Sequence, residues 1–142
     1  MCSSDLSLLD ATNIVGRSGQ VNRQEAPQMA VDDDPSTKWC DTSANAEKFI
    51  DFDLGSVRTL NGWYVCHAAA EAPEYITDAF ALKVRDSRNK AWKTVDEVTK
   101  NSDPETNRKL SAPVQARFVR LSVTRGTQSG ENVARIYEFS VY

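Results

Sequence analysis

Hydrophobic and polar residues alternate along several short segments of the chain, the pattern of strands in a sheet with one buried face. The alternation is clear in three segments: residues 50–54, 80–85 and 119–123. Clusters of turn-forming residues lie between such segments, at 86–89, 101–104 and 126–130. Many short strands with this spacing favour an antiparallel sandwich or barrel over alternating strands and helices.

One short helix is predicted around residues 24–29, where Pro27 suits a first turn. The three tryptophans are expected to pack inside the protein rather than stack on a ligand. Trp39 follows an acidic loop, Trp63 lies in a strand, and Trp92 is predicted to pack in the core or under a hairpin.

Length and charge restrict the function classes. With 142 residues, the chain is one domain large enough for a hydrophobic core. The formal net charge is −3, with acidic and basic residues interspersed, which argues against nucleic acid as a partner. Arg117 and Arg120 lie in an alternating strand and are expected to be ion-paired or partly exposed. No apolar run is long enough to span a bilayer.

The segment from Met29 to Trp39 is rich in oxygen ligands for a hard cation. Asp32, Asp34 and Thr37 are closely spaced there. It is not an EF-hand, because Thr37 and Ser43 stand where that loop needs glycine and glutamate. A solvated acidic turn is the alternative, and the loop alone leaves both readings open.

Four segments of the chain, in order, resemble the discoidin or coagulation-factor V/VIII type C domains, whose bacterial versions are family 32 carbohydrate-binding modules. The segments are Ala-Val-Asp-Asp-Asp-Pro-Ser-Thr-Lys-Trp at 30–39, Phe-Ile-Asp-Phe-Asp-Leu-Gly at 49–55, Ala-Arg-Phe-Val-Arg-Leu at 116–121, and Ala-Arg-Ile-Tyr-Glu-Phe-Ser-Val-Tyr at 134–142. The resemblance implies an all-β domain at 13–142, an eight-stranded antiparallel jelly-roll β-sandwich. Residues 1–12 would be an N-terminal segment left by a linker or by cloning.

The same resemblance implies a structural Ca²⁺ that joins the acidic loop to the last strand. The implied ligands are the Met29 and Tyr137 carbonyls, the Asp32, Asp34 and Glu138 carboxylates, and Thr37. Ligand binding in the family occurs on loops at one end of the sandwich. The matching residues are His67, Asp41, Glu71 and Asn132 as polar groups and Tyr75 as an aromatic platform for a glycan. Plain solvated loop residues are the alternative for Asp41, Glu71 and Asn132.

Three departures from the galactose-binding pattern affect this prediction. Many such modules have histidine directly after the signature tryptophan, where this chain has Cys40. The arginine expected after the following strand is not evident, and the last loop lacks an aromatic residue. The sugar is therefore left open. The loop at 42–48 has no large hydrophobic residue to insert into a membrane, which disfavours lipid binding.

The sequence shows no catalytic motif. Cys66 and His67 are neighbours in a strand and should point to opposite faces. The family resemblance implies a non-catalytic carbohydrate-binding module that targets a parent glycan-degrading enzyme of a bacterium, secreted or on the cell surface, and this is our prediction. The alternative is a structural spacer or protein-interaction domain without sugar binding.

The cysteines leave several readings open. Cys40 and Cys66 both follow predicted strands, so a disulfide between them and two free thiols are both compatible with the pattern, with free thiols preferred. Cys2 is either a lipidated cysteine or a remnant of cloning. Residues 1–5 do not have the pattern of a secretory leader, so the chain is either a cytosolic protein or a domain excised from a longer chain. We expect the second, because the matching motifs run to the last residue, Tyr142.

Overall fold

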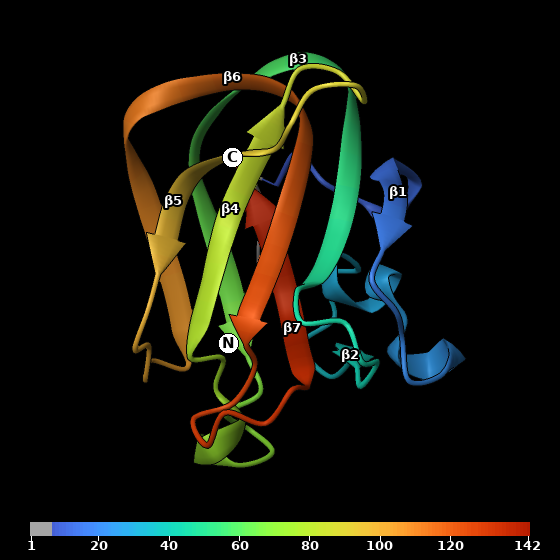
Figure 1. Ribbon diagram of the computed structural model, residues 1–142, viewed down its shortest axis with the longest axis vertical. Helices are drawn as coiled ribbons and strands as arrows, with labels where there is room; N and C mark the ends of the chain where they lie inside the picture. Colours follow the sequence, from blue (N-terminus) through green and yellow to red (C-terminus); the bar gives the residue numbers. More distant parts are fainter. Residues whose placement is uncertain (1–6) are drawn as a thin grey trace.

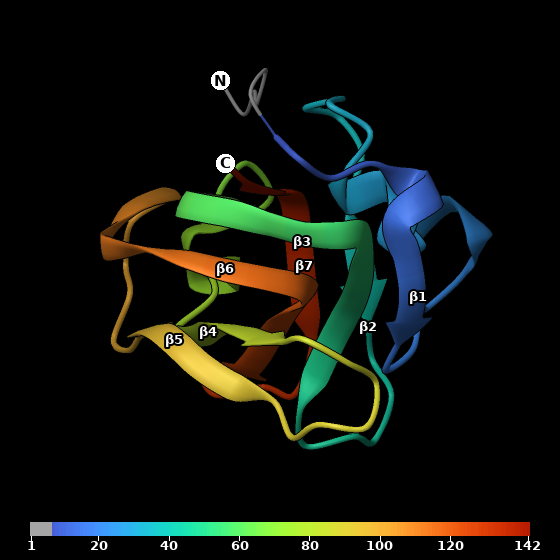
Figure 2. The same cartoon turned by 90° about the horizontal axis from the view of Figure 1, so that it is seen from above.

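Two long strands determine the shape of the domain: β3 (Lys48–His67) and β6 (Glu105–Arg125). They pair antiparallel along most of their length, with register breaks between Asp53 and Arg58 and between Leu60 and Gly62. Gly55 lies at the first break with a φ of 85°, a conformation that glycine adopts without steric cost. Each strand bends there and contributes to both layers of a sandwich (Figure 2).

The remaining strands are divided between the two layers. The computed structural model describes residues 7–142, and its other elements run in this order: η1 (Ala11–Asn13), β1 (Ile14–Arg17), η2 (Arg23–Glu25), η3 (Pro27–Ala30), β2 (Trp39–Asp41), η4 (Pro73–Tyr75), β4 (Ala79–Arg85), β5 (Lys93–Val98) and β7 (Ala134–Val141). The first half of β3 and the second half of β6 share a layer with β1, β4 and β5. The second half of β3 and the first half of β6 form the other layer with β7 and β2 (Figure 1).

The predicted all-β class and antiparallel jelly-roll sandwich are confirmed. The described part of the chain has seven strands rather than eight, because each bent strand is continuous through both layers. The helix predicted around 24–29 consists of two 3-10 turns, η2 and η3, and Pro27 is the first residue of the second turn. The three predicted turn clusters all lie between strands. No helix within residues 7–142 is long and apolar enough to cross a membrane.

The packed domain begins before the predicted boundary at Asn13. Leu9 is buried among the core residues, and the Leu8 amide donates a hydrogen bond to the Val141 carbonyl at 2.8 Å. Leu8 and Leu9 of the predicted N-terminal segment therefore pack against the sandwich. This contact between the two ends of the chain is not revealed by local sequence pattern.

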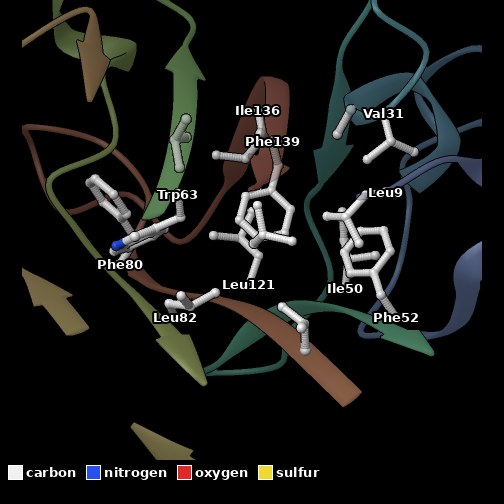
Figure 3. Close-up of a cluster of buried hydrophobic side chains, with 14 of the residues drawn as sticks. Leu9, Val31, Ile50, Phe52, Trp63, Phe80, Leu82, Leu121, Ile136 and Phe139 are labelled. Carbon is white, nitrogen blue, oxygen red and sulfur yellow. The ribbon is translucent and has the colours of Figure 1, made fainter. Parts of the chain in front are cut away.

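The core lies between the two layers (Figure 3). The alternating residues Ile50 and Phe52 point into it, and the Phe52 ring lies 5.6 Å from that of Phe139. Trp63 packs edge-on against Phe80, with ring centroids 5.5 Å apart. Aromatic pairs at such distances add to the stability that burial supplies.

The tryptophan predictions are confirmed. Trp39 and Trp63 are fully buried, and each indole N–H has an acceptor: the Gly19 carbonyl at 2.9 Å and Asp96 Oδ2 at 2.8 Å. Trp92 is half-buried beside the hairpin, beneath the Arg85 guanidinium at 4.2 Å.

The arginines of β6 are ion-paired, as expected. Arg120 contacts both carboxylate oxygens of Asp51, at 2.6 and 2.9 Å. Arg117 does the same with Asp53, at 2.9 and 3.0 Å. These bidentate pairs join the neighbouring strands β3 and β6 on their outer face.

Candidate functional site

The acidic loop before β2 folds around the Thr37 hydroxyl. Thr37 Oγ1 lies 3.4 Å from the Met29 carbonyl oxygen, 2.5 Å from Asp32 Oδ2 and 3.2 Å from the Asp34 carbonyl oxygen. Asp33, between the two aspartates, has a positive φ of 55°, which closes the turn. Four of the six predicted calcium-binding residues therefore supply oxygen atoms to one small region.

The Asp34 side chain forms hydrogen bonds within its own turn. Its Oδ1 accepts hydrogen bonds from the amide of Ser36 at 2.9 Å and the hydroxyl of Ser36 at 2.7 Å. The contact of Asp34 with Thr37 is made through the Asp34 carbonyl oxygen, at 3.2 Å. The Ser36 contacts lower the pKa of Asp34, so the group is ionised at neutral pH.

Glu138, on β7, lies beside this loop as predicted. Glu138 is only 3% exposed, and its Oε2 is buried without a hydrogen-bond partner among the described residues. Burial, followed by the nearby charges of Asp32 and Asp33, raises the pKa of Glu138 to about 8. The Asp33 amide donates to this carboxylate and opposes the shift. The Tyr137 carbonyl, which precedes it on β7, stays a predicted ligand.

The residues around Glu138 fit a hard cation. A buried carboxylate oxygen without a partner needs a positive charge or a proton, and the surrounding donors are all oxygen atoms, which calcium prefers. No three His, Cys, Asp or Glu side chains within residues 7–142 form a metal-binding group on their own. An ion here would therefore depend on main-chain and threonine oxygens as well as on carboxylates.

Asp41 has a structural role rather than the predicted ligand contact. It is 0% exposed and accepts hydrogen bonds from the Ser18 hydroxyl and, at 2.8 Å, from the Ser43 amide. Gly19 packs so closely that a Cβ there would lie 2.7 Å from Asp41 Oδ1. Both carboxylate oxygens are therefore used to hold neighbouring loops together.

His67 is also not available at the surface. The residue is 2% exposed, its ring centroid lies 4.9 Å from that of Phe80, and Nε2 lies 2.9 Å from Thr106 Oγ1. Strand β3 continues through His67, whose amide donates to the Pro104 carbonyl. The register with β7 also shifts between Cys66 and His67. The ring therefore points into the core, which corrects the predicted sugar contact.

The buried His67 ring should make the domain sensitive to acid. Burial lowers the pKa of His67 from 6.5 to about 3, so the unfolded chain binds an extra proton between these values. Stability is therefore present above pH 6.5 and is lost as the pH falls towards 3, by up to about 1.4 kcal/mol per pH unit. We expect denaturation curves of His67→Phe to lack this slope. An identical pH dependence for the variant and the wild type would contradict this assignment.

Asn132 remains exposed, and its Nδ2 donates to the Asn45 carbonyl at 3.3 Å. It joins the last loop to the loop before β3. The other two predicted sugar-binding residues, Glu71 and Tyr75, lie within a larger polar surface.

This polar surface, here called the Glu71 surface, surrounds the ends of β2 and β7. Its members are Glu25, Lys38, Glu71, Tyr75, Arg135 and Tyr137. Lys38 Nζ bridges Glu25 at 3.1 Å and Glu71 at 2.9 Å. The Tyr137 hydroxyl donates to Glu71 Oε2 at 2.9 Å.

Arg135 lies between Tyr75 and Glu25 in this surface and interacts with both. Its guanidinium lies 3.9 Å from the Tyr75 ring centroid, a cation–π contact. Both Lys38 and Arg135 help to lower the pKa of Glu25 against the effect of its burial. Arg135 Nη1 is buried and has no hydrogen-bond partner among the described residues. The surface thus combines carboxylates, cations and two aromatic rings.

Sequence reasoning missed Glu25, Lys38 and Arg135. A signal for two of them was present, because Lys38 precedes the buried Trp39 and Arg135 alternates with the buried Ala134 and Ile136. Period-two alternation places Arg135 on the outer face of its strand, and Lys38 lies just before β2.

A hollow of about 190 Å³ lies next to the Glu71 surface. Tyr137 lines both, and the wall of the hollow is mainly apolar, with Pro35, Ala69, Ala70 and Pro104. His67 also lines the hollow, but little of its surface is accessible there, since it is almost fully buried. An apolar wall beside planar hydrogen-bonding groups is the usual composition of a small-molecule site.

The cysteines differ from both readings of the sequence. Cys40 is a buried free thiol, so the Cys40–Cys66 disulfide is wrong. Cys66 is disulfide-bonded, so the preferred pair of free thiols is wrong as well. Cys2 and the two readings of it lie outside the described residues. A disulfide and a core-facing imidazole exclude a Cys66–His67 catalytic dyad.

The sequence profile of the F5/8 type C domain matches residues 14–139. The chain belongs to this family. No curated protein sequence gives a significant match.

Solved structures share the fold of this F5/8 type C domain. The family 32 carbohydrate-binding module of Streptococcus pneumoniae EndoD is 24% identical, with a TM-score of 0.76 and coverage of 91% of this chain and 93% of that one. Chitosan-binding module 2 of a Paenibacillus chitosanase/glucanase, solved with chitotriose, is 22% identical, with a TM-score of 0.73 and coverage of 92% and 96%. A GH29 fucosidase of Ruminococcus gnavus, solved with fucose, is 19% identical, with a TM-score of 0.80, and the match covers 99% of this chain but 27% of the fucosidase.

Proposed function

We propose that this F5/8 type C domain is a non-catalytic carbohydrate-binding module that binds a glycan on the Glu71 surface. The observation that supports this most is the arrangement of Glu71, Lys38 and Tyr137 beside the apolar hollow. Sugar hydroxyls need planar or charged hydrogen-bonding groups, and the C–H face of a sugar ring needs an apolar wall. The chitotriose complex of a module with the same fold supports the same class of ligand.

The module would tether a parent glycan-degrading enzyme to its substrate. The match to about a quarter of a fucosidase chain supports a place within a larger enzyme. Tethering raises the effective concentration of the substrate at a catalytic domain, so modest affinity is sufficient. We propose a bacterial, secreted or cell-surface enzyme as the parent.

We also propose a structural calcium ion at the acidic loop. Met29, Asp32, Asp34 and Thr37 would hold it from the loop, with Glu138 and the Tyr137 carbonyl from β7. The ion would compensate the buried charge of Glu138 and fasten an early loop to the last strand. Tyr137 would then belong to both sites, with its carbonyl at the ion and its side chain at the glycan.

A glycan array tests the binding proposal. We expect the wild-type domain to bind a defined glycan and Glu71→Gln to bind it about tenfold more weakly, since the variant loses a charged hydrogen-bond acceptor. Glu97→Gln is the matched control, because Glu97 is an exposed residue of β5 outside the Glu71 surface. A blank array for the folded wild type would favour the alternative, a structural spacer or protein-interaction domain.

A further inference from the structure

One side of the sandwich is open between β5 and the first half of β6. Within residues 7–142, β5 pairs with β4 alone, and residues 105–116 of β6 pair with β3 alone. Figures 1 and 2 both place β5 next to this half of β6. Two hollows of about 290 and 320 Å³ lie along this side. They share Val95 and Val114 and are therefore adjacent, and the two hollows together are here called the β5–β6 cleft.

The β5–β6 cleft is strongly basic. Its charged lining residues are Arg85, Lys90, Lys93, Arg108 and Lys109 against Asp86 and Asp96. Asp96 is already occupied, because Arg108 contacts both of its oxygens, at 2.8 and 3.0 Å, and the Trp63 indole donates to it at 2.8 Å. Asp86 lies 3.6 Å from Lys90 in a largely exposed pair. Both acids are therefore neutralised by the chain itself.

Three cations of the cleft are left without a counter-ion. Lys93 and Lys109 are exposed and form no ion pair in the described part of the chain. Arg85 is held over the Trp92 ring and donates from Nη1 to the Lys90 carbonyl at 3.3 Å, but its Nε is buried without a partner. The net positive charge of the cleft is thus available to an anionic ligand.

The floor of the cleft indicates which kind of anion fits. Val84, Val95 and Val114 line it, with the polar side chains of Gln115 and Ser111 nearby. Valine methyl groups can pack against the C–H face of a sugar ring, while amide and hydroxyl groups meet its hydroxyls. A small inorganic anion would leave this apolar floor uncovered.

The edges of the cleft do not suit a peptide strand. Pro113 has no N–H to donate in the free edge of β6, and the lysines Lys93 and Lys109 are typical of edges that resist strand addition. A peptide added along β6 would therefore lack a continuous ladder of hydrogen bonds. Separate contacts to carboxylates and hydroxyls meet no such obstacle.

We propose that the β5–β6 cleft binds an acidic oligosaccharide, with Lys93, Lys109 and Arg85 contacting its carboxylates. This site is separate from the Glu71 surface, whose residues come from η2, η4, β7 and the segments just before β2 and η4. The domain would then have a second glycan-binding site, between β5 and β6, and the ligand of this second site would be acidic. Because charge supplies the attraction, the affinity should fall as the salt concentration rises.

Titration calorimetry with tetragalacturonate tests this site, with cellotetraose as the neutral probe. We expect the wild type to bind the acidic tetramer and the double variant Lys93→Glu/Lys109→Glu to bind it at least about tenfold more weakly. The matched control is Lys100→Glu/Arg58→Glu, which makes the same change in net charge at exposed residues outside the cleft lining. The control should retain most of the affinity.

Several results would overturn the proposal. One is the absence of tetragalacturonate binding by the wild type, and another is an equal loss in the control variant, which would show unspecific charge attraction. A loss with Glu71→Gln but not with the cleft variant would assign the ligand to the Glu71 surface. Tight binding of an oligoglutamate peptide in place of the sugar would show a protein partner. None of these results decides the glycan-array test of the Glu71 surface, so the two proposals can fail separately.

Discussion

Glu138→Gln is expected to abolish the stabilisation of the domain by calcium. At a hundredfold excess of Ca²⁺ over its Kd, binding to the folded state alone should raise the free energy of unfolding of the wild type by about 3 kcal/mol. The variant keeps the shape of the side chain but lacks the buried charge that would hold the ion. Its free energy of unfolding should be the same with calcium and with chelator.

The same substitution should stabilise the metal-free domain at high pH. The folded-state pKa of Glu138 is raised to about 8 from 4.5, so the folded protein binds more protons than the unfolded chain between these values. This contribution to stability is fully present below pH 4.5 and is lost as the pH rises through 8, by up to about 1.4 kcal/mol per pH unit. Glu138→Gln removes that loss.

Urea denaturation at pH 5 and pH 8, with calcium or with chelator, checks both expectations, and Glu97→Gln is the control. The benefit of calcium should be larger at pH 8, where the metal-free carboxylate has to ionise without a counter-ion. Two results would contradict the calcium site: an equal gain of stability in Glu138→Gln and the wild type, or no bound metal together with identical melting in chelator.

In the metal-free domain, Glu138 and His67 have opposite effects on the pH dependence of stability. Between pH 4.5 and 6.5 the folded state holds an extra proton on Glu138, while the unfolded chain holds an extra proton on His67. The two slopes cancel in this window, so the wild type should show little pH dependence there. Each single variant should reveal the slope of the other group.

The strands were largely predictable because their signal is local. Alternation at 50–54 and 80–85 follows directly from the burial of one face of a strand. The passage of β3 and β6 through both layers was not predictable in this way. It depends on how β3 bends at Gly55, which the sequence shows only as a glycine after a strand.

The candidate sites show the same difference between what local sequence reveals and what distant contacts determine. The proximity of Glu138 to the acidic loop came from resemblance to a family, and the structure bears it out. His67 and Asp41 were misassigned because their burial depends on distant partners, Phe80 for the imidazole and Ser18 for the carboxylate. A residue at the end of a strand looks the same in sequence whether a later segment covers it or not.

Gly126→Ala is expected to destabilise the domain strongly, because the site has no space for a methyl group. A Cβ at Gly126 would lie 1.7 Å from the Val133 carbonyl oxygen and 2.6 Å from its carbon, and a backbone cannot move aside like a flexible side chain. The loop that joins β6 to β7 would have to open at its base. We expect a loss of about 3 kcal/mol in the free energy of unfolding, the upper part of the range for overpacking.

Gly55→Ala provides the contrast, because a Cβ there meets nothing within 4 Å. Its cost comes from the positive φ of 85° alone and should be about 1 kcal/mol. Urea denaturation of both variants separates a clash from backbone strain. The Gly126 substitution should also weaken calcium and glycan binding, since the displaced loop leads directly into β7, which carries Arg135, Tyr137 and Glu138. Equal losses in the two variants would show that the loop relaxes freely and does not set the position of β7.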